Sequence, residues 1–372
     1  MSQKIVFLDQ YNNIGGGQTI LVNLVKFCLD LGYEIEIWIP KGGYIQSQLS
    51  SFQHLIKYRE INIPQLNNSS KNIRDISKMI YFSLCFSKYI KFLKKVDKVY
   101  INGPRLALAG MLTSLFTHKQ YFYHVHLIHS PIEKIIFNLA QNLPFTKKVI
   151  LGSDFIANNY YHSHLVLSRH KKATIFNGFL GREYNHLEFE DRFLEGDQHN
   201  DRNRYNIMLH GRISPEKGQD IFLKLAKDFP QHNFYIIGFP SNTEYYHQLR
   251  EDAPANIIFD KTTNVPELVK KLNIHFSISP SVCEEAFGLS PLEAMACSCI
   301  SLVSHRGNYV NTAQHTNAVL FDDYQDLRSK LQFLLSNNKQ ELSQIAYEQY
   351  CNTIEKYNLS SRVQQFTEIL EK

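Results

Sequence analysis

Apolar and polar residues alternate along this chain in a way that predicts strands and helices in turn. A short apolar run at residues 5–8 is followed by a helical pattern from Ile20 to Leu29, and Gly32 ends that pattern. Further short apolar runs follow at residues 35–39, 98–101, 121–124 and 149–151. Because helical patterns separate these runs, we expect a parallel, doubly wound sheet.

The same alternation starts again in the second half of the chain. Its apolar runs lie at residues 205–210, 234–237, 257–259, 274–279 and 300–303. Between the halves, Asn177-Gly178 is followed by a polar, acid-rich stretch that ends near Asn203. We therefore predict an α/β protein with two Rossmann-like domains facing a cleft. The predicted boundaries are 1–180 for the first domain, 181–203 for a linker, 204–355 for the second domain and 356–372 for a final helix.

Two glutamates in the second half suggest a site for a polyhydroxylated ligand. Glu285 follows the strand-like run at residues 274–279, and Glu293 lies about one turn into a segment of good helix formers. A passage from strand to helix at the carboxyl edge of an α/β sheet is where such folds bind ligands. Carboxylates placed there can accept hydrogen bonds from sugar hydroxyls. The alternative is that both are solvated surface acids.

Each half also has a glycine-containing turn between a strand and a helix. The first is Gly15-Gly16-Gly17, where backbone amides can approach a phosphate at the positive end of a helix. It lacks the G-x-G-x-x-G spacing of dinucleotide sites, and a turn without a ligand is equally compatible. The second contains Gly211, Arg212 and Lys217, whose two cations suit a diphosphate leaving group.

Histidines follow one strand of the first half. His124 and His126 lie at the end of the run at residues 121–124, where an imidazole can polarise a hydroxyl near neutral pH. A structural role is the alternative for both, and we favour His126 as the functional residue.

Composition narrows the class of protein. The length of 372 residues suits two domains, and no apolar run is long enough for a membrane span. No signal peptide is recognisable, and the six cysteines lack a paired metal-ligand spacing, so we expect a cytoplasmic protein without a metal or other cofactor. Residues 1–180 hold 21 Lys+Arg against 9 Asp+Glu, and residues 181–372 hold 19 against 26. The basic half suggests an anionic partner: a phospholipid surface, a phosphorylated acceptor or nucleic acid.

One segment of the basic half is amphipathic. In a helix over residues 82–98, one arc would carry apolar side chains and the other would carry Lys88, Lys91, Lys94, Lys95 and Lys98. The lysine arc could attract anionic lipid headgroups, and a sheet-packing helix with a solvated lysine face is the alternative.

In their order along the chain, these motifs resemble glycosyltransferase family 4, which has the GT-B fold. The motifs are Gly15-Gly16, the strand-end His126, Asn177-Gly178, Gly211-Arg212 with Lys217-Gly218, Ile236-Ile-Gly238 and the segment from Glu285 to Ala296. The resemblance covers nearly the whole chain, and the last motif is the most specific. It implies a retaining, metal-independent transferase that uses a nucleotide-sugar donor.

The resemblance also implies a role for individual residues. Arg212 and Lys217 would bind the donor diphosphate, with Gly211 freeing the backbone beside them, and Glu293 would bind the ribose hydroxyls. Glu285 and the backbone around Phe287, Gly288 and Leu289 would hold the transferred sugar. Gly15 and Gly16 would present amides to the distal phosphate, and His126 would contact the sugar or the acceptor. The final helix would cross back onto the first domain.

The sequence departs from the family pattern after residue 296. The segment Cys297-Ser-Cys-Ile-Ser301 replaces a small-Gly-x-Pro-Val pattern, and Arg306-Gly-Asn-Tyr-Val310 lacks a glutamate of the family. We expect a transferase that builds a bacterial surface polysaccharide or lipopolysaccharide on a glycan or lipid-linked acceptor, peripheral to the cytoplasmic membrane and without a nucleic-acid partner. The alternatives are a GT-B nucleotide-sugar epimerase and a non-catalytic partner subunit that binds a donor or lipid.

Overall fold

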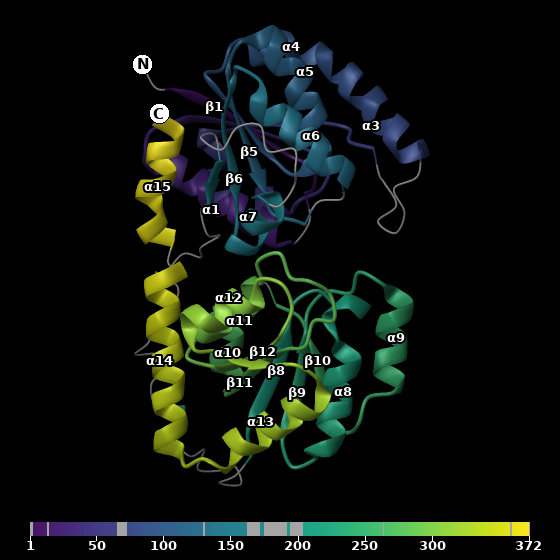
Figure 1. The fold of residues 1–372 in the computed structure, drawn as a ribbon, viewed down its shortest axis with the longest axis vertical. Helices are drawn as coiled ribbons and strands as arrows, with labels where there is room; N and C mark the ends of the chain where they lie inside the picture. Colours follow the sequence, from purple (N-terminus) through teal and green to yellow (C-terminus); the bar gives the residue numbers. More distant parts are fainter. Residues whose placement is uncertain are drawn as a thin grey trace. The chain divides into compact units, whose positions relative to one another are not determined.

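A computed structural model describes residues 3–12, 15–64, 73–128, 131–161, 172–174, 192–193, 204–262, 264–357 and 359–371. The chain divides into two compact units (Figure 1). The N-terminal unit comprises Met1–Asn177 with Val363–Lys372, and the C-terminal unit comprises Gly178–Arg362. Asn177-Gly178 and most of the predicted linker at 181–203 lie outside the described residues.

The N-terminal unit contains a parallel sheet of seven strands in the order β3-β2-β1-β4-β5-β6-β7. The strands are β1 (Lys4–Asp9), β2 (Glu34–Ile39), β3 (Ile56–Glu60), β4 (Lys98–Asn102), β5 (Gln120–Val125), β6 (Thr146–Leu151) and β7 (Lys172–Thr174). Residues 5–8 of β1 are buried, because helices cover both faces of a parallel sheet. This burial explains why these strands read as continuous apolar runs in the sequence.

Helices connect the strands of this unit. They are α1 (Gly16–Asp30), α2 (Tyr44–Gln48), α3 (Ile73–Cys85), α4 (Ile90–Leu93), α5 (Ala107–Thr117), α6 (Pro131–Asn142) and α7 (Asp154–Tyr161). Short 3-10 turns η1 (Ser50–Leu55), η2 (Phe86–Tyr89) and η3 (Pro104–Leu106) complete the connections. The end of the last helix, α15 (Leu359–Glu371), also belongs to this unit, where Phe366 and Leu370 are buried. The ring of Phe366 lies 6.4 Å from that of His124, measured between centroids.

The C-terminal unit contains a parallel sheet of six strands in the order β10-β9-β8-β11-β12-β13. The strands are β8 (Asn206–His210), β9 (Asn233–Ile237), β10 (Ile257–Asp260), β11 (Phe276–Ser279), β12 (Ile300–Ser304) and β13 (Val319–Phe321). The helices are α8 (Gln219–Asp228), α9 (Thr243–Glu251), α10 (Val265–Lys271), α11 (Leu289–Ala296), α12 (Tyr309–Thr316), α13 (Tyr324–Ser336) and α14 (Lys339–Tyr357), with the 3-10 turn η7 (Pro215–Lys217) before α8. Both units are therefore α/β layers around a parallel sheet, and the predicted fold class is confirmed.

The amphipathic segment at residues 82–98 differs from the single helix predicted for it. It is divided among the end of α3, the turn η2 and the short α4, and Lys98 begins β4. Phe86, Leu93 and Val96 of the apolar arc are buried, but Cys85 and Phe92 of the same arc are exposed. Lys98 is also buried, and it donates to the Tyr33 hydroxyl at 3.0 Å. Lys98 is therefore not part of a lysine surface. The four remaining lysines, Lys88, Lys91, Lys94 and Lys95, are exposed.

Apolar side chains are exposed on the neighbouring helices α3, α5 and α6. Tyr81 and Leu84 of α3, Phe116 of α5 and Leu139 of α6 are each more than half exposed. Among the helices that the structure describes, none combines the length and the apolar character needed to cross a lipid bilayer.

Candidate functional site

The carboxyl edge of the C-terminal sheet begins at the turn that leaves β8. Gly211 follows His210 with φ +135°, a backbone conformation that favours glycine. Its amide donates to the Ile237 carbonyl at 2.9 Å, and a Cβ at Gly238 would lie 1.7 Å from the Gly211 carbonyl oxygen. The turns after β8 and β9 therefore touch through their backbones, and this contact fixes where Arg212 leaves the sheet.

Lys217 and Glu285 meet at this edge. The Lys217 ammonium forms an ion pair with Glu285 Oε1, which also accepts from the Ser281 hydroxyl at 2.6 Å. The Glu285 side chain is only 9% exposed, whereas that of Lys217 is 26% exposed. The backbone joins the same two loops, since the Val282 amide donates to the Glu216 carbonyl at 3.0 Å. A partly accessible cation is thus held beside a buried carboxylate.

Glu293 has a different partner. It lies on α11, and its Oε2 is 3.2 Å from His210 Nε2 at the end of β8. The His210 side chain is nearly covered, while that of Glu293 is 21% exposed. The two glutamates therefore occupy separate places on this edge, Glu285 next to Lys217 and Glu293 next to His210.

Arg212 lies on the more exposed side of the turn. Its Nη2 donates to Glu216 Oε1 at 2.7 Å, and both side chains are well exposed. The sequence predicted both Arg212 and Lys217 as cations at the mouth of the domain. The structure places both on the turn between β8 and α8, each with a carboxylate as its partner.

The loop from Glu285 to α11 is held by glycines in positive-φ conformations. Gly288 has φ +80° and lies so close to Tyr309 that a Cβ would be 2.2 Å from that ring. Gly307 has φ +54°, and a Cβ there would be 2.4 Å from the Glu285 carbonyl oxygen. The Asn308 amide donates to that same oxygen at 2.8 Å, so the turn after β12 supports the Glu285 loop.

Phe287 and Leu289 flank Gly288 at the start of α11. The Phe287 ring is buried 5.9 Å from the ring of Tyr357, so its side chain contributes packing and only its backbone lies along the loop. Its carbonyl accepts from Asn308 Nδ2 at 2.9 Å. Leu289 is the first residue of α11, where the backbone amides of a first helical turn have no partner within the helix.

The carboxyl edge of the N-terminal sheet holds the other predicted residues. Gly15 caps α1 in an extended conformation with no side chain as a cap, and Gly16 begins the helix and is exposed. His126 follows β5, and its Nε2 lies 2.5 Å from Asn102 Oδ1 at the end of β4. The rings of His126 and His124 are 3.8 Å apart, and the buried His124 is bonded through Nδ1 to the Tyr100 hydroxyl at 2.7 Å.

Three side chains at these edges were not predicted from the sequence. They are His210, which holds Glu293, and Asp9 and Asn102, which lie behind His126. The sequence did contain a signal for Asp9 and Asn102, because each is a polar residue that directly follows an apolar run. In the sheet they are register partners, and Asn102 is paired in turn with His124.

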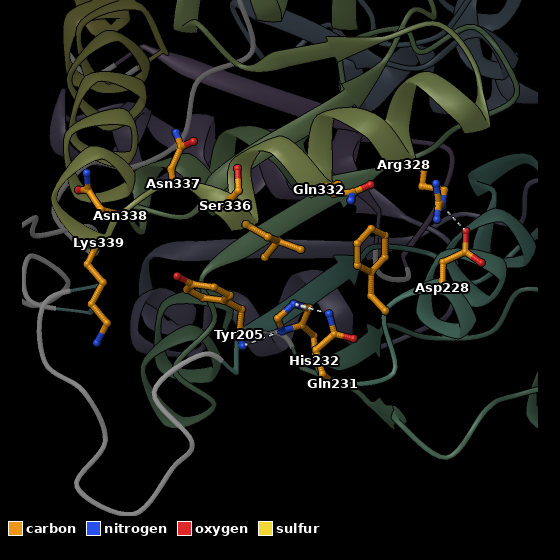
Figure 2. A pocket seen from close by; sticks show the side chains of 12 residues that line it. Tyr205, Asp228, Gln231, His232, Arg328, Gln332, Ser336, Asn337, Asn338 and Lys339 are labelled. Carbon is orange, nitrogen blue, oxygen red and sulfur yellow. Dashed lines mark hydrogen bonds and ion pairs between the residues drawn. The ribbon is translucent and has the colours of Figure 1, made fainter.

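A groove lies at the opposite edge of the C-terminal sheet (Figure 2). It has a volume of about 840 Å³ and is bordered by Tyr205 and His232, which precede β8 and β9, and by Lys339 at the start of α14. Burial, followed by the charge of Arg204, lowers the pKa of His232 to about 4, so its ring is neutral near pH 7. None of the predicted site residues lines this groove.

In the ranges that the structure describes between residues 3 and 371, no three or more His, Cys, Asp or Glu side chains are grouped in a way that could hold a metal ion.

A family model matches part of the chain. Residues 191–350 match the family model described as glycosyl transferases group 1. None of the curated protein sequences matches the chain. The sequence-based assignment to family 4 within this group remains a prediction.

Several solved structures share the fold over the whole chain. A crystal structure of Anabaena Alr3699/HepE in complex with UDP and glucose has a TM-score of 0.78 at 21% identity, covering 100% of both chains. Sucrose-phosphate synthase from Thermosynechococcus elongatus has a TM-score of 0.77 at 13% identity, covering 99% of this chain and 98% of the other. WaaG, a glycosyltransferase involved in lipopolysaccharide biosynthesis, has a TM-score of 0.70 at 11% identity, covering 98% and 99%. The chain therefore has the GT-B fold.

Proposed function

We propose that this protein is a retaining glycosyltransferase that moves a sugar from a nucleotide-sugar donor to a glycan or lipid-linked acceptor without a divalent metal. The observation that carries the proposal is the arrangement at the carboxyl edge of the C-terminal sheet. There a cation, Lys217, is paired with the carboxylate of Glu285, and a second carboxylate, that of Glu293, is held separately by His210 at the end of β8. The match of residues 191–350 to group 1 glycosyltransferases supports the same assignment.

The ion pair between Lys217 and Glu285 suggests how a donor would bind. A diphosphate carries more charge than a carboxylate, so it would compete with Glu285 for the Lys217 ammonium. Glu285 would then be available to accept hydrogen bonds from hydroxyls of the transferred sugar. Lys217 and Arg212 would stabilise the negative charge that develops on the diphosphate as it leaves.

Glu293 is the proposed ligand of the ribose. Its carboxylate is partly exposed, and His210 holds one of its oxygens from the strand side. Gly211, Phe287, Gly288 and Leu289 would contribute backbone rather than side-chain contacts. In the N-terminal unit, Gly15 and Gly16 would present amides to the distal phosphate, and His126 would contact the sugar or the acceptor.

The choice of donor for a first experiment follows from the structural relatives. Structures of Anabaena Alr3699/HepE contain UDP, UDP with glucose, or UDP-glucose, so UDP-glucose heads the panel to be tested. Binding is measured by calorimetry with and without EDTA, using wild type and Glu293→Ala. We expect binding that EDTA does not change and that the substitution weakens. Absence of binding by every nucleotide sugar would contradict the proposal.

Product analysis tests the type of reaction. Retention predicts that the anomeric configuration of the donor sugar is kept in the product, which NMR reports. Formation of an epimer without acceptor would instead identify a nucleotide-sugar epimerase. Donor binding without turnover across acceptors would identify a partner subunit that is not catalytic.

The acceptor side of the proposal rests on the N-terminal unit. Exposed lysines at residues 88, 91, 94 and 95 and exposed apolar side chains on α3 provide both charge and hydrophobic contact for an anionic membrane. Peripheral attachment to the cytoplasmic face of a bacterial membrane would bring the enzyme to lipid-linked intermediates. Similarity to WaaG supports a place in surface polysaccharide or lipopolysaccharide synthesis.

A further inference from the structure

A carboxylate is completely buried behind His126. Asp9 ends β1, and four hydrogen bonds reach its two oxygens. The donors are the Tyr11 amide at 2.8 Å, Gln18 Nε2 at 2.9 and 3.2 Å, and Asn102 Nδ2 at 2.6 Å. None of these donors is charged. A buried carboxylate held by neutral groups is costly, which suggests that its position serves the residues it touches.

Asp9 fixes the orientation of the Asn102 amide. Asn102 Nδ2 faces two acceptors, Asp9 Oδ2 at 2.6 Å and the Gly17 carbonyl at 3.2 Å. Rotating the amide by a half-turn would place its oxygen against both of these oxygens, which is repulsive. The amide nitrogen therefore points toward Asp9 and Gly17, and the amide oxygen points toward His126.

The fixed amide then determines the tautomer of His126. Asn102 Oδ1 can only accept, and it lies 2.5 Å from His126 Nε2, so Nε2 must carry the hydrogen. In the neutral ring, Nδ1 is consequently the nitrogen that accepts a hydrogen bond. We infer that Asp9 and Asn102 are positioning residues that hold His126 in its Nε2–H tautomer. In the transfer reaction proposed above, on which this part rests, they would set which ring nitrogen of His126 carries the hydrogen.

The sheet topology explains how Asp9, Asn102 and His126, which are distant in sequence, form one hydrogen-bonded relay. β4 lies between β1 and β5, and Asp9 and Asn102 are paired in register. His126 follows directly from β5, and its ring lies next to Gly17 at the start of α1. Burial raises the pKa of Asp9 to about 6, although its hydrogen bonds oppose this, so the acceptor form predominates above pH 7.

The tautomer can be read without any substrate. Protein labelled with ¹⁵N-histidine gives two-bond ¹H–¹⁵N correlations whose pattern distinguishes Nε2–H from Nδ1–H, and His126→Gln assigns the signal. At pH 7.5 we expect the Nε2–H pattern for wild type. The Nδ1–H pattern in wild type would overturn the inference, and this outcome needs no variant to fold.

Asp9→Asn gives a sharper test. The side chain of the new residue keeps an acceptor for Tyr11 and Gln18 and presents an NH₂ group to Asn102 at the short 2.6 Å contact. This contact should outweigh the longer 3.2 Å contact with the Gly17 carbonyl, so we expect the Asn102 amide to turn over. Asn102 then donates toward His126, so we expect the Nδ1–H pattern. Gln18→Met is the matched control, because it also removes a hydrogen bond to Asp9 but leaves Asn102 in place, and the Nε2–H pattern should remain. An unchanged pattern in folded Asp9→Asn would overturn the inference.

A kinetic readout separates this inference from the proposed function. If the protein transfers sugar, Asp9→Asn should lower kcat by roughly tenfold, while the affinity for the free nucleoside diphosphate should change little. Of its proposed ligands, Arg212, Lys217 and Glu293 lie in the other unit, and only Gly15 and Gly16 lie in this one. If no donor is turned over, the proposed function fails while the NMR patterns still decide whether Asp9 and Asn102 set the tautomer.

Discussion

The carboxyl edges of the two sheets carry similar residue types but hold them by different means. In the C-terminal unit, carboxylates are paired with basic side chains, as in Lys217–Glu285 and His210–Glu293, and at least one member of each pair is partly accessible. In the N-terminal unit, the Asp9 carboxylate is fully buried and its donors are a backbone amide and two side-chain amides. A ligand can therefore displace the partners of the carboxylates in the C-terminal unit, whereas it cannot reach the buried carboxylate of Asp9.

This difference separates two tasks. An ion pair with one exposed member can exchange partners when a more highly charged group arrives, so the edge of the C-terminal sheet is suited to binding and releasing an anion. A buried amide network does not exchange with solvent, and what it supplies is a fixed orientation for His126. The following predictions test whether the two edges keep these separate properties.

The largest expected effect concerns the burial of Asp9. Its pKa is raised to about 6 in the folded protein, against 3.8 for the free side chain, so the folded state binds the proton more tightly between these values. Stability contributed by the protonated form is therefore present below pH 4 and is lost as the pH rises through 6. Two pKa units correspond to about 3 kcal/mol.

Comparison with Asp9→Asn isolates this contribution. The difference in unfolding free energy between wild type and Asp9→Asn should shift against wild type by about 3 kcal/mol from pH 4 to pH 7. Urea denaturation at several pH values measures it, with Gln18→Met as the control. A difference that does not vary with pH would show that the Asp9 carboxylate is not buried as described.

The second prediction concerns the exchangeable ion pair. Lys217→Ala should lower turnover at least tenfold, because a charge-assisted hydrogen bond to the leaving diphosphate is worth about 1.5–3 kcal/mol. It should also destabilise the fold, because the buried Glu285 loses its cationic partner. Steady-state kinetics and thermal unfolding measure the two effects separately.

A double variant separates the effect of Lys217 on stability from its effect on turnover. Lys217→Met combined with Glu285→Gln removes the unpaired charge, so stability should recover while turnover stays low. Arg212→Ala provides the comparison with an exposed pair: its turnover should fall, but its stability should change by less than about 1 kcal/mol. Turnover near that of wild type in Lys217→Ala would exclude this lysine from the diphosphate site.

The next prediction separates the two glutamates. Glu293→Ala should weaken binding of the free nucleoside diphosphate by about tenfold, because the proposed contact is with the ribose. Glu285→Ala should leave that binding nearly unchanged and lower the rate of transfer, because the proposed contact is with the sugar. Calorimetry with the nucleoside diphosphate alone tests the division of roles, and equal losses of affinity in both variants would contradict it.

The sequence predicted most of the strands because each is an apolar run buried in a parallel sheet. Residues 5–8 became β1 (Lys4–Asp9), and residues 300–303 became β12 (Ile300–Ser304). β3 (Ile56–Glu60) was missed, because this edge strand has only one buried residue and no apolar run to recognise. The helix predicted over residues 82–98 was wrong in its length, since periodicity alone did not separate a 3-10 turn and the start of a strand from a helix.

At the candidate site, the sequence indicated residues but not their partners. Glycine turns and glutamates are recognisable from local spacing. The contact between His210 and Glu293, by contrast, depends on β8 lying beside β11, a neighbour 69 residues away at the paired position of Phe276 with Ile207. The relay from Asp9 to His126 likewise depends on β4 lying between β1 and β5. Such crossovers of strand order are not encoded in any local pattern.

The smallest effect on turnover is expected from the exposed lysines that lie outside the carboxyl edges of the two sheets. Replacing Lys88, Lys91, Lys94 and Lys95 by glutamine should abolish sedimentation with acidic vesicles, since each lysine near an anionic surface contributes about 1 kcal/mol. Binding of wild type should weaken as salt rises, because the Debye length falls from about 10 Å at 0.1 M to about 3 Å at 1 M. Transfer to a soluble acceptor analogue should be unchanged.

Substitutions of the exposed apolar residues provide the matched control for this surface. Tyr81→Ser with Leu84→Ser removes hydrophobic contact on α3 without changing charge. If apolar insertion assists, this variant should bind acidic vesicles more weakly at 1 M salt, where screening leaves the hydrophobic contribution dominant. Equal binding of wild type and the four-lysine variant would exclude these lysines as the contact. The positive charge of the N-terminal half would then have to act through other residues.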